Sequence, residues 1–231
     1  RSAAAGGVTS VAAMPNTKPV TDDPSVVGHV LEKARVGGIV NVYPVGAITK
    51  GLQGVELTEF GLMLEAGCVA FSDDGATVAD TGVMRRALEY ARAFGALLIQ
   101  HAEDPSLVSG GCMNEGVTSS RLGLPGIPVE SESIMVDRDI RLVELTGGRY
   151  HVAHLSTAGA LEAVAGAQAK GLPVTCEVAP HHFSLTEEAV DGYDTYAKMA
   201  PPLRSEFDRN ALLEGLARGT FSAIATDHAP H

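Results

Sequence analysis

The sequence is poor in the features that mark secreted, membrane-bound and nucleic-acid-binding proteins. It has three cysteines, no tryptophan and 17 Lys and Arg against 28 Asp and Glu, for a net charge of −11. Three scattered cysteines are too few for a disulfide framework, so a cytoplasmic location is the default. The deficit of positive charge argues against a nucleic-acid surface and a polybasic membrane contact. No apolar run approaches the length of a membrane span.

The N-terminal segment also lacks the charged, apolar and small-residue layout of a signal peptide, and it has no initiator Met. Its first residues, RSAAAGGVTS, are typical of the last turn of a helix, Ala3–Ala5, closed by Gly6–Gly7. We therefore expect the chain to begin inside a longer protein.

Seven short apolar runs predict strands that are buried on both faces of a parallel sheet. These runs are Val8–Met14, Ile39–Ala47, Cys68–Ser72, Ala96–Gln100, Tyr150–Leu155, Val174–Val178 and Phe221–Thr226.

Helical patterns separate the predicted strands. They cover Asp23–Val36, Leu57–Glu65, Gly82–Phe94, Glu132–Leu145, Thr157–Lys170 and Ser205–Arg218. Strands that alternate with helices predict a parallel sheet, either a barrel or an open doubly wound sheet. The barrel is favoured because polar residues follow nearly every strand, at the end where barrel enzymes carry their chemistry.

One long segment, Glu103–Val129, shows neither pattern and is predicted to be an irregular excursion after the fourth strand. Loops of this length usually carry function or cover a site.

The residues that follow several predicted strands are of the types that bind catalytic metal ions. Asp73 and Asp74 follow the third predicted strand, His101 follows the fourth, and Asp227 follows the last. Imidazole and carboxylate are the usual ligands of catalytic Zn²⁺, which acidifies a bound water. Any one of these residues alone is better explained as a loop or turn residue, and only their joint placement favours a metal hydrolase.

The fifth strand carries two histidines, His151 and His154, that point to opposite faces. We assign His154 to the site because it lies nearer the strand end.

At these residues the sequence resembles the bacterial type I dihydroorotases of the amidohydrolase superfamily. The motifs that carry the resemblance are MPNTKPV at 14–20, AFSDDG at 70–75, HAED at 101–104, NEG and LGLPGIP within 114–128, HVAHLST at 151–157, CEVAPHH at 176–182, PPLR at 201–204 and ATDHAPH at 225–231. The resemblance runs through nearly the whole chain.

The resemblance implies a (β/α)8 metal-dependent hydrolase barrel of which this chain, residues 1–231, covers strands two to eight. The first strand with its His-x-His pair, the C-terminal helix and a flanking small β domain are then expected outside it. This piece alone is expected to be inactive because part of the metal site is missing.

The resemblance also implies roles for single residues. Asp74 resembles the carboxylate that bridges two metals, and His101 and His154 resemble histidine ligands. Asp227 resembles the residue that touches metal and acts as general base and acid.

Asn16 and His231 resemble substrate-binding residues. The family often has Asn directly before Pro-Pro-Leu-Arg, whereas this sequence has Ala200, and Tyr196 replaces another common Asn. Alanine cannot supply an amide hydrogen bond, so only a backbone group can make this substrate contact here.

The implied activity is the reversible conversion of N-carbamoyl-L-aspartate to (S)-dihydroorotate and water in pyrimidine biosynthesis, with one or two Zn²⁺ per site. The implied partners are the small-molecule substrate and either a second copy of the chain or aspartate transcarbamoylase, with no nucleic acid and no membrane.

Two alternatives stay open. One is a hydantoinase or allantoinase, against which Asp74 and the MPNT and LGLPG segments argue. The other is a non-catalytic dihydroorotase-like partner of aspartate transcarbamoylase, against which the retained metal ligands argue.

Overall fold

A computed structural model describes residues 1–229 of the chain. It divides into two compact units, which are described separately. The first unit holds residues 1–101 and 146–150, and the second holds residues 102–145 and 151 onward. None of the helices in the described part of the chain is long and apolar enough to cross a membrane.

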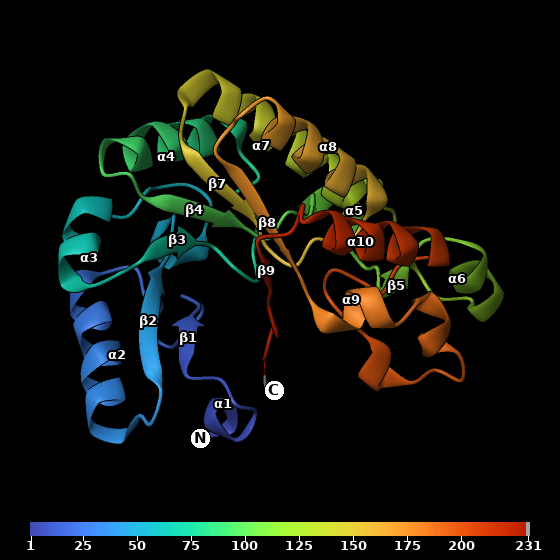
Figure 1. Cartoon of the computed structure of the whole chain (residues 1–231), viewed down its shortest axis with the longest axis horizontal. Helices are drawn as coiled ribbons and strands as arrows, with labels where there is room; N and C mark the ends of the chain where they lie inside the picture. The colour runs from blue at the N-terminus through green and yellow to red at the C-terminus, as the bar shows by residue number, and fades with distance from the viewer. Residues whose placement is uncertain (230–231) are drawn as a thin grey trace. The chain divides into compact units, whose positions relative to one another are not determined.

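The first unit is built on four parallel strands with helices along them (Figure 1). Its strands are β1 (Ser10–Ala13), β2 (Asn41–Gly46), β3 (Ala70–Ser72) and β4 (Leu97–Gln100). Its helical segments are α1 (Ser2–Ala5), α2 (Pro24–Gly37), η1 (Lys50–Leu52), α3 (Phe60–Ala66) and α4 (Thr81–Ala93).

The two longest helices of this unit begin at aspartate capping residues. Asp23 accepts a hydrogen bond from Ser25 N at 2.8 Å and precedes Pro24, the first residue of α2. Asp80 accepts one from Val83 N at 2.7 Å at the start of α4. The buried residues of α4, among them Met84 and Leu88, recur at helical spacing and form its inner face.

The second unit contains the excursion after β4 and the last strands of the sheet. Its strands are β5 (Met113–Asn114), β6 (Gly126–Ile127), β8 (Val174–Val178) and β9 (Ala223–Ile224). Its helical segments are α5 (Pro105–Val108), α6 (Val117–Leu122), α7 (Glu130–Thr146), α8 (Ala158–Ala169), α9 (Pro180–Ser184), η2 (Glu187–Val190), η3 (Thr195–Ala197) and α10 (Glu206–Arg218).

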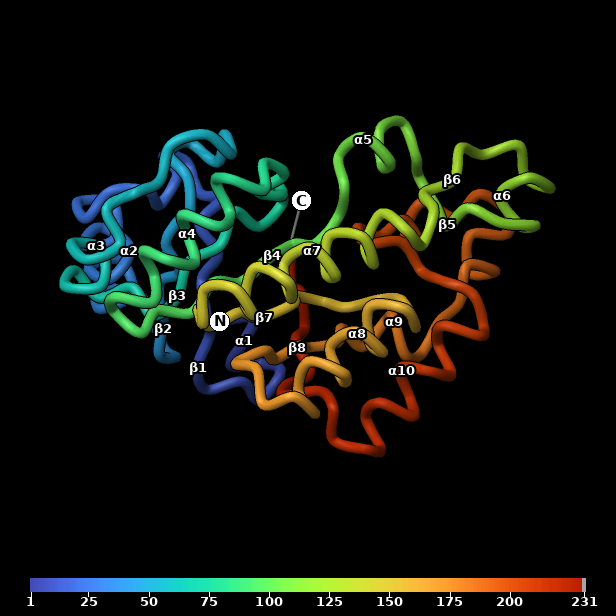
Figure 2. The backbone as a smooth tube through the Cα atoms, turned by 90° about the horizontal axis from the view of Figure 1, so that it is seen from above, coloured from blue at the N-terminus to red at the C-terminus, as the bar shows by residue number. Residues whose placement is uncertain are grey.

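The excursion is more ordered than the sequence predicts. The residues 103–129 form α5, β5, α6 and β6, and β5 pairs with β6 in parallel as a separate two-stranded sheet (Figure 2). A small apolar cluster of Met113, Val190, Ala197 and Leu203 anchors it. The prediction of an irregular loop is therefore wrong for this segment.

The strand β7 (Arg149–Val152) begins in the first unit and ends in the second. The seven strands of the main sheet follow the order β1-β2-β3-β4-β7-β8-β9. This order and the helices between successive strands confirm the predicted βαβ series, and each of the seven predicted strands contains or overlaps an observed one.

The core of the first unit is centred on Phe60. Its ring stacks on Phe71 at 4.2 Å between centroids and on Tyr90 at 5.0 Å. Phe60 and Phe71 are both 0% exposed. This stack joins α3, β3 and α4, so it fixes the strand that leads to Asp74.

We predict that Phe60→Ala lowers the free energy of unfolding by about 3–5 kcal/mol, because it removes the central ring of a packed stack. Chemical denaturation of the full-length protein measures the change. The control is Phe207→Ala, at a ring that is 75% exposed, where we expect a change within about 0.5 kcal/mol. Equal losses in the two variants would contradict the assignment of Phe60 to the core.

Candidate metal centre

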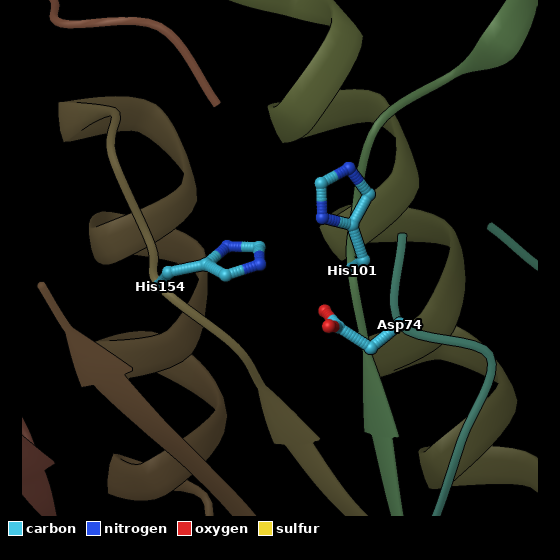
Figure 3. A group of neighbouring side chains, drawn as sticks. All are labelled: Asp74, His101 and His154. Carbon is cyan, nitrogen blue, oxygen red and sulfur yellow. The ribbon is translucent and has the colours of Figure 1, made fainter. Parts of the chain in front are cut away.

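Asp74 and His101 lie level with one another because of the register of their strands. β3 pairs with β4 in parallel, with Ser72 opposite Ile99, and each ligand residue lies two positions further along. Their ligand atoms, a carboxylate oxygen and an imidazole nitrogen, lie within 4.8 Å of each other (Figure 3). His101 is buried and Asp74 is partly buried. A carboxylate and an imidazole at this spacing suit one divalent ion such as Zn²⁺.

Neighbouring hydrogen bonds hold these two strand ends. Thr77 Oγ1 donates to the His101 carbonyl at 2.7 Å, which ties the turn after β3 to the end of β4. The buried Asp73 carboxylate accepts from Thr49 N at 2.9 Å and also from Thr49 Oγ1. Burial raises the pKa of Asp73, and the hydrogen bonds from Thr49 oppose this rise. Asp73 is therefore an anchor beside the candidate ligand Asp74.

Asn16, on the exposed segment after β1, lies beside the same turn. A Cβ atom on Gly75 would lie 3.4 Å from Asn16 Nδ2, and Gly75 has a φ of +85°. Glycine at position 75 thus permits both the left-handed turn and the close approach of the Asn16 amide. The structure brings Asn16 and the turn of Asp74 together within the first unit.

His154 belongs to the second unit, two residues beyond the end of β7. It is 4% exposed, and its φ of +32° is unusual for a residue with a side chain. His151 has other partners, since its Nδ1 lies 2.7 Å from Thr175 Oγ1 and its Nε2 lies 3.4 Å from a Glu177 carboxylate oxygen. The choice of His154 over His151 stays a prediction that agrees with these contacts.

Asp227 lies beyond β9, is exposed and has a φ of +49°. Its charge acts on His181: burial lowers the pKa of that imidazole, the negative charge of Asp227 raises it, and His154 lowers it. The other predicted substrate residue, His231, lies outside the described residues. Ala200 and Tyr196, which stand at two positions where the resemblance leads us to expect Asn, are both exposed.

Sequence reasoning missed two buried charged residues that contact the segment after His154. Glu132, in the first turn of α7, and Arg204, before α10, are 1% and 2% exposed. Burial lowers the pKa of the Arg204 guanidinium, and the negative charge of Glu132 opposes that shift. The one available signal was an arginine directly after the apolar, proline-fixed residues Pro201–Leu203.

The fold and the strand-end residues define a class, the partial (β/α)8 barrel with carboxylate and imidazole groups at its strand ends. The protein-family model described as "Dihydro-orotase-like" matches residues 1–160. The chain belongs to this family.

Curated relatives match the whole chain. This chain is 59% identical over 233 residues to a protein named dihydroorotase from Anaeromyxobacter dehalogenans (strain 2CP-C). It is 56% identical over 231 residues to a protein of the same name from Geobacter sulfurreducens. In both cases the match covers 100% of this chain and 54% of the relative. The chain thus spans about half the length of the curated relatives that it matches.

Solved structures confirm the fold class. L-hydantoinase (dihydropyrimidinase) from Arthrobacter aurescens matches with a TM-score of 0.81 and 26% identity, over 100% of this chain and 52% of the hydantoinase. D-hydantoinase from Thermus sp. matches with a TM-score of 0.78 at 24% identity, over 99% and 52% of the two chains, and supports the fold alone.

A buried histidine near the site gives a pH-dependent prediction. His182 Nε2 donates to the Pro201 carbonyl at 2.9 Å, and its Nδ1 has no hydrogen-bond partner among the described residues. Burial, with the positive charge of His181 as a smaller cause, lowers the pKa of His182 to about 3. The ring is therefore largely neutral in the folded protein from pH 7 down to about pH 4.

We predict that His182 lowers the free energy of unfolding as the pH falls. Below a pH of about 6.5 the unfolded chain binds a proton at His182 and the folded chain does not, so stability falls as pH decreases toward 3. The loss approaches about 1.4 kcal/mol per pH unit from this residue. In denaturation series from pH 7 to pH 4, His182→Gln should show a slope shallower by this amount, whereas His29→Gln, at an exposed helix position, should keep the wild-type slope. Parallel curves for all three proteins would contradict the prediction.

Proposed function

We propose that the protein containing this chain is a zinc-dependent dihydroorotase, a cyclic amidohydrolase that interconverts N-carbamoyl-L-aspartate and (S)-dihydroorotate in pyrimidine biosynthesis. The observation that carries the proposal is the 59% identity over the whole chain to a relative named dihydroorotase. The hydantoinase likeness is at 26% identity and supports the broader class of cyclic amide hydrolysis. The cytoplasmic location expected from the cysteine usage belongs to this proposal.

The proposed metal ligands are Asp74, His101 and His154, the side chains drawn in Figure 3, each of which offers one ligand atom. The parallel pairing of β3 with β4 supports Asp74 and His101, because it places them level with each other. β7 follows β4 in the strand order of the sheet, and strands joined by helical crossovers end at one edge, which supports the third. Two imidazoles and a carboxylate match the ligand set that leaves a catalytic zinc position open.

The chain's own residues would then divide the remaining work. A zinc ion held by these residues would supply Lewis-acid chemistry, acidifying water and polarising the amide carbonyl. In the hydrolytic direction a water oxygen bonds to the ring carbonyl carbon and the carbon–nitrogen bond breaks. Asp227 accepts the water proton on a carboxylate oxygen and delivers it to the departing nitrogen. Asn16 and His231 orient the substrate by hydrogen bonds.

The first test compares metal content and activity in the full-length protein. We expect His154→Ala and His101→Ala to lose bound zinc and to lose turnover of dihydroorotate, because each change removes one ligand. His29→Ala, at an exposed histidine on α2, is the matched control and should keep both. Zinc stoichiometry by elemental analysis and spectrophotometric turnover measure the outcome. Full zinc content and full activity in His154→Ala would refute its place in the site.

The second test addresses proton transfer. We expect Asp227→Asn to lower kcat by about 10²–10⁴-fold, because the amide cannot accept the water proton. Asp194→Asn, at an exposed aspartate that caps η3, should leave kcat unchanged. Near-wild-type kcat in Asp227→Asn would remove this residue from the mechanism. A wild-type protein that hydrolyses hydantoin or dihydrouracil in preference to dihydroorotate would instead favour a hydantoinase.

A further inference from the structure

His154 holds a backbone conformation that a histidine does not adopt without support. Its φ of +32° lies in the left-handed region, where a Cβ atom approaches neighbouring backbone. A strained residue of this kind persists only when its surroundings fix it, and such residues cluster at functional sites. The residues that directly follow His154 should therefore carry the contacts that fix it.

Three consecutive residues after His154 are held by hydrogen bonds from other elements. Leu155 N donates to the Glu177 carbonyl on β8 at 2.9 Å. Ser156 N donates to both Glu132 carboxylate oxygens, at 3.1 and 3.0 Å, and Thr157 N donates to Oε1 at 2.9 Å. The Ser156 and Thr157 hydroxyls donate to the same carboxylate. The backbone N–H groups and the hydroxyls of Ser156 and Thr157 thus all donate to Glu132.

Arg204 also belongs to this hydrogen-bonded group. Its Nε donates to Ser156 Oγ at 3.1 Å, and its Nη1 donates to Asn114 Oδ1 at 3.0 Å and to the Ile127 carbonyl at 2.9 Å. Its positive charge also offsets the buried negative charge of Glu132. Through Asn114 and Ile127 the same guanidinium ties β5 and β6 of the excursion to the segment of His154.

We propose that Glu132, Ser156 and Arg204 are positioning residues for His154, which hold its backbone in the strained conformation that the metal ligand needs. The idea rests on the proposed function, since it assumes that His154 binds metal. A carboxylate that accepts from two successive backbone N–H groups and two hydroxyls, one of which also accepts from Arg204, is rigid enough to balance the strain. Partners of metal ligands commonly change metal affinity by about 10–100-fold when removed.

A purely structural explanation makes a different prediction. Glu132 accepts from Thr157, the N-cap of α8, so it could serve only to stabilise that helix. Asp208 offers a comparison, because its Oδ1 accepts from Ala158 N at 3.0 Å, at the first residue of α8, and it makes none of the hydrogen bonds described above for Ser156 and Arg204. Loss of the Asp208 carboxylate removes a hydrogen bond at the same helix end, together with the one from Ser205 Oγ at the start of α10 and a negative charge that acts on Arg204. It removes none of the hydrogen bonds of Ser156 or Arg204.

The experiment measures zinc affinity of the full-length protein by competition with a chromophoric chelator, together with thermal unfolding of the zinc-free form. We expect Ser156→Ala to weaken zinc binding by about tenfold or more. Asp208→Ala should lower the unfolding temperature and keep zinc affinity within about twofold of wild type. Zinc affinity unchanged in Ser156→Ala, or lowered equally in Asp208→Ala, would overturn the proposal.

Glu132→Gln provides the second variant if Ser156→Ala does not fold. The amide keeps the shape of the carboxylate but presents an NH2 group to backbone donors, so we expect a loss of zinc affinity of at least the same size. An unchanged affinity in Glu132→Gln would also overturn the proposal. His154→Ala separates the two hypotheses: if it binds zinc as tightly as wild type, the proposed site is wrong, whereas normal zinc binding in Ser156→Ala alone refutes only the positioning role.

Discussion

The parallel register of neighbouring strands is the constraint on which the candidate site depends. Hydrogen bonds between β3 and β4 set Ser72 opposite Ile99, and this pairing alone brings Asp74 level with His101 two residues later. The Phe60 stack fixes β3 from one side, and Thr77 ties the turn after β3 to the end of β4. A shift of one residue in this pairing would turn the two ligand side chains to opposite faces of the sheet.

The second unit shows how a buried charge can serve a site without touching the reacting atoms. Glu132 lies in an environment where an unpaired carboxylate would be costly, and it accepts hydrogen bonds there from two backbone N–H groups and two hydroxyls. Its negative charge also acts on the buried Arg204 guanidinium. Such a group gains little stability over an apolar replacement of similar size. Its value in this protein is geometric, because it fixes the segment that begins at His154.

The sequence predicted the strands well because each is a short apolar run closed by polar residues, and the predicted Val174–Val178 matches β8 in both bounds. It predicted the helices from apolar residues that recur at helical spacing, and the caps Asp23 and Asp80 mark the observed starts of two of them. The excursion was beyond such reasoning. Its two-residue strands and short helices are too brief for any periodicity, and they are held by long-range contacts such as that of Arg204 with Asn114.

The candidate ligands could be proposed from the sequence because they follow successive strands together, whereas the hydrogen-bonded group behind the His154 segment could not. Ser156 and Arg204 are 48 positions apart in the chain, and the local sequence of neither segment predicts their hydrogen bond. The same holds for Gly75. The turn sequence around it predicts a positive φ, but its approach to Asn16 depends on the pairing of β1 with β2 and of β2 with β3.

The most direct test of the central claim is a crystal structure of the full-length protein grown with zinc, with diffraction data collected on both sides of the zinc absorption edge. The account predicts an anomalous peak within about 2.0–2.2 Å of the Asp74 carboxylate and of one imidazole nitrogen each of His101 and His154. A peak bound by other residues, or none at these three side chains in a protein that turns over dihydroorotate, would contradict it.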